Sequence, residues 1–464
     1  MNSTVTFSVT NPATGEHLDD VPDFSADQVL AQVKVAQEAF LQWSGVAPRK
    51  RAEILTTAYE LMIADAERLR DLIVAENGKS QADAEAEVRY AAEFFRWYAE
   101  EAVRMQGEYT TAPAGGVRNV VTHHPVGVAL LITPWNFPAA MATRKIGPAL
   151  AVGCAVVLKP ARETPLTAIA IAEILERAGL PEGAVQVATT TSTREVVSAL
   201  LADDRIKKLS FTGSTPVGRT LLGQCAQRVV NASMELGGNA PFIVTADADI
   251  EAAVDGAMIA KFRNSGQACT AANRFYVHAD VAEQFIEAFG TRISQLQVGD
   301  PAEGSQIGPL IHEKAAADVQ ALIDGAVHDG ATIAYQAQVP ETAATKAFTP
   351  PTLLRDVPAD ARILTEEIFG PVAPVVVWND LEEMLSQAND AEVGLSSYVY
   401  AGNLQQAMRI GERLEAGMVG VNRGIVSDPS APFGGVKQAG IGREGGHWGI
   451  EEFTEPQYLS VDWS

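Results

Sequence analysis

From Val126 to Leu236 the sequence alternates short apolar runs with longer segments of helical periodicity. The apolar runs are VGVALLIT, AVVLKP, VQVAT, KKLSFTG and RVVNASMEL, and segments such as TPLTAIAIAEILERAG and TREVVSALLAD separate them. Because strands that are buried on both faces read as continuous apolar runs, this pattern is typical of a parallel sheet covered by helices. We therefore expect an α/β fold with ligands at the carboxyl ends of its strands.

Two further regions flank this series. Before it, helical spacing predicts helices over residues 25–43, 48–76 and 80–105, the first opened by a Ser-x-x-Gln capping box. After Leu236 a second alternating series begins with APFIVT and includes RFYVHA, PVVVW, SSYVYA and MVGVN. The second series predicts a second α/β domain, which we expect to share an extensive interface with the first.

Composition narrows the class of protein. Hydrophobic residues make up 47% of the 464 residues, and no apolar run approaches the roughly 18 residues that span a bilayer. The net charge of -23 argues against a nucleic-acid partner. The N-terminus has neither the basic start nor the apolar stretch of a secretory signal, and three cysteines do not suggest a disulfide framework. We expect a cytoplasmic protein with no membrane partner and no metal site.

Cys269 lies in the stretch RNSGQACTAANR, among small and polar residues. A thiolate is a strong nucleophile, and small neighbours would let a carbonyl group and backbone N–H donors approach it. A lone cysteine is more often a small buried apolar residue, and Cys154 and Cys225 keep that interpretation because their surroundings are apolar.

Three other stretches supply polar side chains near predicted strand ends. TPWNFP follows a predicted strand and presents Asn136, and MELGGN places Glu235 at the end of another strand, where burial would raise its pKa toward that of a useful base. EEIFGPV carries a third polar group, Glu367. Taken singly, Glu235 and Glu367 would more often be solvated surface carboxylates.

Taken together and in order, these motifs resemble the aldehyde dehydrogenase superfamily. The likeness extends from TNPATGE through PWNFP, LKP, FTGST, ELGGNAP, GQACTAANR and EEIFGPV to APFGGVKQAGIGREGG. It implies a Rossmann-type cofactor domain, an α/β catalytic domain and a small β extension for oligomerisation. The divisions expected are 1–106 and 126–236, 237–451, and 107–125 with 452–464, in that order.

The resemblance also implies catalytic roles. Cys269 is similar to the family's nucleophile, which forms a thiohemiacetal and then a thioester with the aldehyde carbon. Asn136 and the backbone N–H of Cys269 correspond to the donors for the developing oxyanion, and Glu235 corresponds to the base that activates water.

A nicotinamide cofactor is implied although no GxGxxG fingerprint is present. In FTGSTPVG a strand leads through Gly213 and Ser214 into a helix whose N-terminal N–H groups can meet pyrophosphate. Arg162 stands where relatives that use NAD carry a glutamate, so NADP is favoured over NAD; an arginine facing solvent is the alternative. The residues expected at the cofactor are Thr133, Pro134, Trp135, Lys159, Arg162, Gly213, Ser214, Leu236, Glu367 and Phe369.

Specificity is expected from Arg144, Arg263 and Ser427, which match residues that hold the far carboxylate of the substrate in succinate-semialdehyde dehydrogenases, the branch of the superfamily that the chain resembles most. Two arginines facing one cavity imply an anionic guest. Succinic semialdehyde is the first expectation; glutaric, 2-oxoglutaric and sugar-derived semialdehydes and neutral hydroxyaldehydes remain open. Ala271 stands where some relatives have a second cysteine, so no local disulfide switch is expected.

Strands around EYTTAPAGGVRNVVTHHP and QYLSVDW resemble those that join subunits in the family, which implies a homo-dimer or homo-tetramer. Two alternatives remain open. A cysteine esterase would use the same thiol and oxyanion donors, and a structural or binding protein would use neither.

Overall fold

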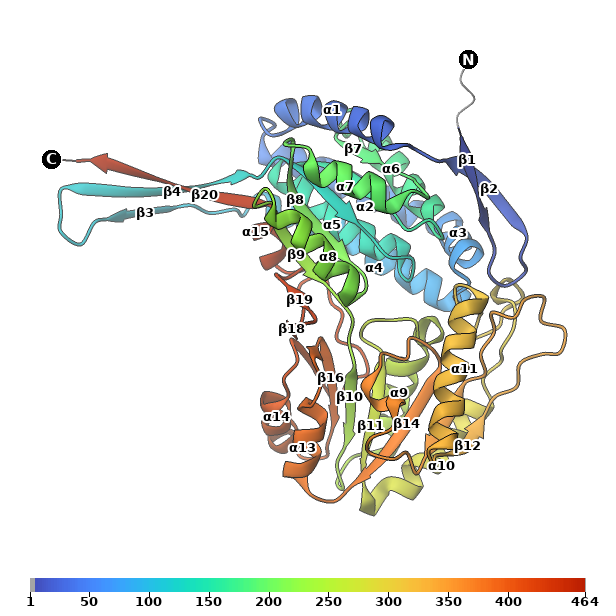
Figure 1. Cartoon of the computed structure of the whole chain (residues 1–464). Helices are drawn as coiled ribbons and strands as arrows, with labels where there is room; N and C mark the ends of the chain where they lie inside the picture. Colours follow the sequence, from blue (N-terminus) through green and yellow to red (C-terminus); the bar gives the residue numbers. More distant parts are fainter. Residues whose placement is uncertain (1–4, 464) are drawn as a thin grey trace.

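The computed structural model describes residues 5–463, and they form two α/β bodies joined side by side, with a long β arm projecting from one of them (Figure 1). The N-terminal body begins with the hairpin β1 (Thr6–Thr10) and β2 (His17–Pro22), which the sequence patterns did not predict. Four helices follow: α1 (Ala26–Trp43), α2 (Pro48–Ala64), α3 (Ala66–Asn77) and α4 (Gln81–Ala102). The capping box predicted at Ser25 is present, with Gln28 as its second member.

The single helix predicted over residues 48–76 is wrong. Asp65 leaves the helical conformation at φ -91° and ψ 13°, and its backbone N–H turns back to the preceding turn, so that α2 ends and α3 starts anew. Apolar spacing continues across the break because both helices bury residues of the same core, including Leu55, Met62 and Leu69.

The first predicted alternation forms a six-stranded sheet in the order β19-β9-β8-β5-β6-β7. Its strands β5 to β9 pair in parallel, as predicted. The edge strand β19 comes from a distant part of the chain, inside the range predicted for the catalytic domain, and pairs with β9 in antiparallel orientation. The elements are β5 (Val128–Ile132), α5 (Pro138–Val152), β6 (Ala155–Lys159), α6 (Pro165–Arg177), β7 (Val185–Val187), α7 (Thr193–Ala202), β8 (Ile206–Thr212), α8 (Thr215–Ala226), β9 (Asn231–Glu235) and β19 (Gly440–Ile441).

The second alternation forms a seven-stranded sheet in the order β12-β13-β14-β11-β10-β16-β17, parallel except at the edge pair β12 and β13. The strands are β10 (Ala240–Val244), β11 (Ala272–His278), β12 (Thr332–Gln336), β13 (Thr352–Arg355), β14 (Val372–Trp378), β16 (Ser396–Tyr400) and β17 (Met418–Val421). The helices are α9 (Ile250–Phe262), α10 (Ala279–Ser294), α11 (Glu313–His328), α12 (Arg362–Thr365), α13 (Leu381–Asn389) and α14 (Leu404–Arg413), with 3₁₀ turns at Arg263–Gly266 and Pro301–Glu303. The short helix α15 (Trp448–Glu451) packs on α5 of the first body, at the base of the arm (Figure 1). β15 (Val393–Gly394) pairs with β18 (Val436–Lys437). The α/β class predicted from the sequence is confirmed.

The arm consists of three antiparallel strands, β3 (Glu108–Thr111), β4 (Val117–Pro125) and β20 (Thr454–Asp462). It extends away from the two bodies (Figure 1), and its large side chains Tyr109, Tyr458, Leu459 and Trp463 are exposed.

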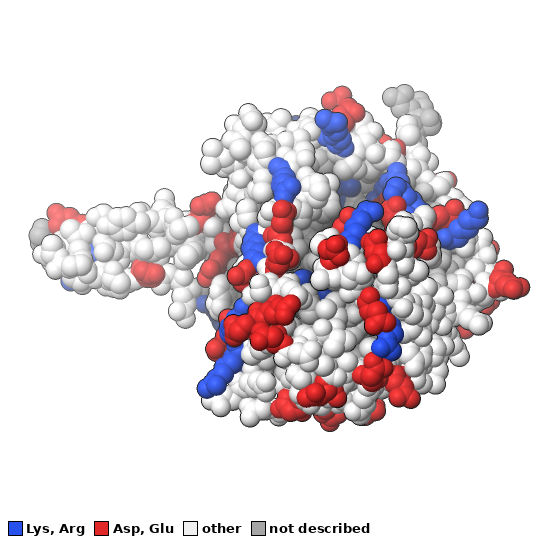
Figure 2. All heavy atoms as spheres, turned by 60° about the horizontal axis from the view of Figure 1, so that its bottom comes forward, with Lys and Arg blue, Asp and Glu red and all other residues white. Residues whose placement is uncertain are grey.

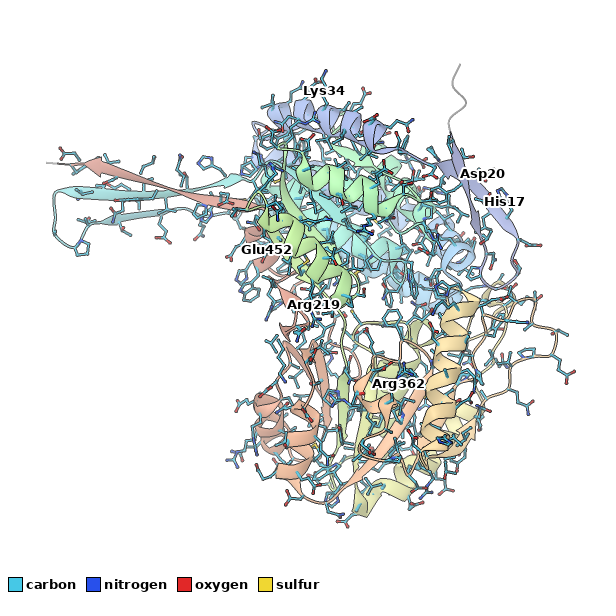
Figure 3. The ribbon with its side chains drawn as sticks, viewed as in Figure 1. His17, Asp20, Lys34, Arg219, Arg362 and Glu452 are labelled. Atoms are coloured by element: carbon cyan, nitrogen blue, oxygen red, sulfur yellow. The ribbon has the colours of Figure 1, made fainter. Side chains whose placement is uncertain are left out.

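Polar contacts join the two bodies at Arg219 on α8, which is labelled in Figure 3. Arg219 donates a hydrogen bond to Gln438 and lies 3.7 Å from Glu392.

Acidic side chains are spread over the face drawn in Figure 2, with basic side chains set between them. Among the described residues, no helix is both long and apolar enough to cross a membrane.

Candidate active site

Cys269 lies between two cavities. The first cavity, of about 250 Å³, is formed at the carboxyl end of the six-stranded sheet and closed by residues of the second body. The second cavity, of about 170 Å³, lies between α4, α5 and the loop that carries Ser427. Among the described residues, only Cys269 and Met141 line both cavities, so a group bound to the sulfur is accessible from either side.

The loop that holds Cys269 is built from unusual backbone conformations. Asn264, Ser265 and Gly266 all have positive φ, at 51°, 55° and 77°. A Cβ on Gly266 would stand 2.3 Å from the carbonyl oxygen of Gly370, so only glycine fits there. The sequence argument assigned the small residues to substrate access; at Gly266 the structure shows instead that the missing side chain admits a neighbouring backbone.

Buried side chains fix this loop. Asn264 Nδ2 donates to the carbonyl oxygen of Asn136 at 2.8 Å, and the Ile311 N–H donates to Gln267 Oε1 at 2.9 Å. The Asn136 side chain donates through Nδ2 to the carbonyl oxygen of Gln267 at 3.1 Å, which leaves its second N–H free for another acceptor. Hydrogen bonds therefore join the loop that carries Asn136 to the loop that carries Cys269, and both residues line the first cavity.

Burial raises the pKa of the Cys269 thiol to about 12, although Arg144 and Arg263 oppose the shift. The protein alone therefore keeps sulfur 269 protonated, and ionisation needs a base or a bound cation. Cys154 and Cys225 are buried free thiols, as their apolar surroundings predicted.

Glu235 ends β9, is buried and lines neither cavity. Its Oε2 has no hydrogen-bond partner among the described residues. Burial and the neighbouring carboxylate of Glu444 raise the pKa of Glu235 well above its usual value, while Lys145 and Arg144 oppose them. This carboxyl has the perturbed pKa expected of a general base, and its charge contributes to the raised pKa of the Cys269 thiol.

The first cavity gathers most of the residues predicted to hold a cofactor. Pro134, Trp135, Gly213, Ser214, Leu236, Glu367 and Phe369 all line it. Trp135 and Phe369 meet edge to face at 5.5 Å, and Glu367 Oε1 accepts the N–H of Gly238 at 3.1 Å. A Cβ on Gly237 would stand 2.7 Å from Glu367 Oε2, so this glycine lets the carboxylate approach.

The N-terminus of α8 opens on the same cavity. Ser214 is its N-cap but makes no side-chain hydrogen bond to the first turn, and the hydroxyl of Thr212 is buried without a partner among the described residues. An uncapped helix N-terminus of this kind is a ready site for a phosphate group.

Three predicted cofactor residues lie outside the first cavity. Thr133 is buried at the end of β5, beside Lys159 at the end of β6. Burial lowers the pKa of Lys159 to about 8, and the described residues offer its amine no hydrogen bond. Arg162 is exposed, pairs with Glu163 at 3.0 Å and lines a separate cavity beside β1, so the structure does not bring it to the first cavity.

The three residues predicted to bind the substrate meet in the second cavity. Arg144 is almost fully buried: Nη2 donates to the hydroxyl of Tyr90 at 3.3 Å, Nη1 lies 3.5 Å from Glu444, and Nε and Nη1 make no hydrogen bond among the described residues. Arg263 makes no ion pair within residues 5–463, and its guanidinium lies 5.1 Å from the ring of Phe137. Ser427 completes the polar lining.

Several residues of this site carry no recognisable sequence signal. Tyr90 is one of many polar positions on α4. Phe433 lies on a loop that is distant in sequence, and the centre of its ring is 4.0 Å from the Arg144 guanidinium. Glu444 lies in the motif GREGG, yet its contact with Lys145 and Arg144 is evident only in three dimensions.

Known proteins resemble this chain in fold and in sequence. The sequence pattern of the aldehyde dehydrogenase family matches residues 1–459. A succinate-semialdehyde dehydrogenase of Paenarthrobacter nicotinovorans is 48% identical, over 94% of this chain and 97% of the relative. A glutarate-semialdehyde dehydrogenase of Pseudomonas putida is 45% identical, over 98% and 94%. A crystal structure described as an NADP-dependent enzyme of E. coli superposes with a TM-score of 0.96 at 45% identity, over 99% and 95%.

Proposed function

The chain belongs to the aldehyde dehydrogenase family, and from that premise we propose that it oxidises a carboxylate-bearing aldehyde, succinic semialdehyde first, with NADP or NAD. The net reaction consumes aldehyde, oxidised cofactor and water and yields carboxylate, reduced cofactor and two protons. The observation that carries the proposal is the position of Cys269, shared by a cavity suited to a nicotinamide and a cavity lined by arginines.

In this proposal Cys269 Sγ adds to the aldehyde carbon, and the oxygen becomes an oxyanion. The free N–H of Asn136 and the backbone N–H of Cys269 stabilise that charge, and removing one such donor costs about 2.7–4 kcal/mol in related sites. The oxidised cofactor supplies the acceptor for the hydride, and its positive ring favours ionisation of a nearby thiol.

Glu235 then acts on the thioester that remains. Its burial keeps the carboxyl away from bulk water and raises its pKa, which makes the ionised form a stronger base. A water molecule that gives its proton to Glu235 attacks the thioester carbon, and Cys269 is the leaving group.

The second cavity supports an anionic substrate. A buried guanidinium with unpartnered donors, as at Arg144, is costly unless a guest completes its hydrogen bonds. A carboxylate placed between Arg144, Arg263 and Ser427 would do so while the aldehyde end reaches Cys269. The volume of about 170 Å³ suits a short aliphatic chain, so glutaric semialdehyde is the alternative substrate.

Residues of the first cavity, together with Lys159 outside it, fit a nicotinamide dinucleotide. The uncapped N-terminus of α8 would hold pyrophosphate, the buried amine of Lys159 would hold ribose hydroxyls, and Glu367 would hold the second ribose. We propose NADP as the favoured cofactor, with Arg162 leaving Glu163 to pair with the 2′-phosphate.

We further propose a homo-dimer or homo-tetramer, because the arm exposes Tyr109, Tyr458 and Leu459 on strands that extend away from both bodies. Sedimentation of the purified protein at micromolar concentration tests the assembly, and a monomer would contradict it.

The domain division expected from the sequence is also part of the proposal. A cytoplasmic location is the last part, and the three free thiols suit it.

The direct test is absorbance at 340 nm with succinic semialdehyde and each nicotinamide cofactor. A dehydrogenase produces reduced cofactor at a rate that falls to background in Cys269→Ala. Ester hydrolysis without any reduced cofactor would identify a cysteine esterase instead, and the absence of both activities would favour a binding protein.

A further inference from the structure

The turn between α3 and α4 supports the loop that presents Asn136. Asn77 Nδ2 donates to the carbonyl oxygen of Trp135 at 3.0 Å, and Lys79 Nζ donates to the carbonyl oxygen of Asn136 at 2.7 Å. Gly78 between them has φ +83° and lies against Pro12 and Pro309, so the turn itself is tightly packed. Two successive carbonyl groups of the loop are thus fixed by two side chains of one turn.

A buried ion pair completes this support. Lys79 pairs with Glu87 on α4, and neither side chain has any solvent exposure. Glu87 Oε1 also accepts the N–H groups of Ala139 and Ala140, at 2.9 Å and 3.3 Å, in the first turn of α5. One lysine and one glutamate therefore hold the end of the loop and the start of the helix that follows it.

Lys79 also reaches toward the substrate cavity. Its ammonium lies 3.9 Å from the centre of the Phe137 ring, the same ring that Arg263 approaches at 5.1 Å. The buried pair thus contacts residues on both sides of the reacting centre, the oxyanion donor and the wall of the second cavity.

We infer that Lys79 is a positioning residue, which with Glu87 holds the Asn136 amide at the place where the oxyanion forms. The inference rests on the proposed role of Asn136. A misplacement of about 1 Å in such a group can cost a hundredfold in rate. A buried ion pair is a poor source of stability compared with apolar residues of the same volume, which favours a reason other than stability for this pair.

A double-mutant cycle tests the inference. Lys79→Met is expected to lower kcat/KM by about tenfold to a hundredfold in the wild-type background. In the Asn136→Ala background the same substitution is expected to change kcat/KM by less than about threefold, because the group that Lys79 positions is already gone. The loss is expected to be equal for succinic semialdehyde and butanal, since both form the same oxyanion.

The matched control is Lys208→Met. Lys208 is also fully buried and pairs at 2.9 Å with Glu452, a side chain that is 24% exposed near the base of the arm, where Figure 3 labels it. It reports what the loss of a buried lysine from a Lys–Glu pair costs in stability. If Lys79→Met does not fold, Lys79→Met/Glu87→Gln takes its place, because the amide oxygen can still accept the N–H groups that begin α5.

The outcomes separate the two proposals. Equal losses from Lys79→Met in both backgrounds, or no loss in either, would overturn the positioning role and leave the proposed function intact. An Asn136→Ala protein with undiminished kcat/KM would overturn the proposed oxyanion site itself, and the positioning role with it.

Discussion

Replacing Arg263 with alanine is the clearest test of the anionic substrate. Arg263 lines the second cavity, forms no ion pair within the described part of the chain and contacts the Phe137 ring. Arg144 is a less direct target, because its guanidinium also faces Glu444 at 3.5 Å and its loss would disturb the charges around Glu235. A change in kcat/KM caused by Arg263→Ala therefore reports on substrate binding more than on the stability of the fold.

The size of the effect follows from the site. Removing one partner of a buried charge pair costs about 2–5 kcal/mol. Arg263 is only partly buried, and Arg144 and Ser427 would still hold the carboxylate, so the lower end applies. A loss of about 2 kcal/mol corresponds to roughly a 30-fold fall in kcat/KM for succinic semialdehyde.

The assay compares succinic semialdehyde with butanal, a neutral aldehyde of equal chain length, through reduced-cofactor absorbance. The ratio of the two kcat/KM values is expected to fall about 30-fold in Arg263→Ala. Arg413→Ala serves as the control, because Arg413 pairs with Glu382 on an exposed surface remote from both cavities, and it should leave the ratio unchanged. An equal loss on both aldehydes in Arg263→Ala would refute the carboxylate contact.

Three further predictions concern charges around the site. Arg162→Glu should shift the ratio of kcat/KM for NADP to that for NAD by about tenfold toward NAD, and an unchanged ratio would exclude a phosphate contact. Because Glu444 raises the pKa of Glu235, Glu444→Gln should move the acidic limb of the kcat profile to lower pH; a shift to higher pH would contradict the assigned cause. Burial lowers the pKa of Lys261 to about 7, so the folded protein binds fewer protons than the unfolded chain above pH 7 and its stability should rise with pH, by up to about 1.4 kcal/mol per unit between pH 7 and 9. Denaturant unfolding should show that rise in the wild type and a smaller rise in Lys261→Met, where Lys159, whose pKa burial lowers to about 8, still contributes; the same slope in both would refute the role of Lys261.

Local periodicity was sufficient for the parallel strands and their helices, because the apolar runs of β5, β6 and most of β8 are buried on both faces. It failed where a break depends on one backbone turn, as at Asp65, or where a strand pairs across a long sequence separation. The pairing of β19 with β9 joins residue 440 to residue 235, and nothing in either short stretch encodes that contact.

The motifs predicted residues that line the two cavities better than they predicted the residues that support them. Cys269, Asn136, Arg144 and Arg263 were singled out from their motifs, and they line the two cavities. Their partners were not, since the hydrogen bond from Lys79 to the Asn136 carbonyl oxygen depends on how α4 packs on α5. Arg162 illustrates the converse, because in this structure its guanidinium pairs with Glu163, whereas the motif argument paired it with a cofactor phosphate.

The most direct test of the account is to find the covalent intermediate on Cys269. Protein mixed with succinic semialdehyde and oxidised cofactor, quenched in acid within the first turnover and digested, is expected to carry a succinyl thioester on the peptide that contains Cys269 and on neither Cys154 nor Cys225. The same peptide unmodified while reduced cofactor accumulates, or the acyl group on another residue, would contradict the account.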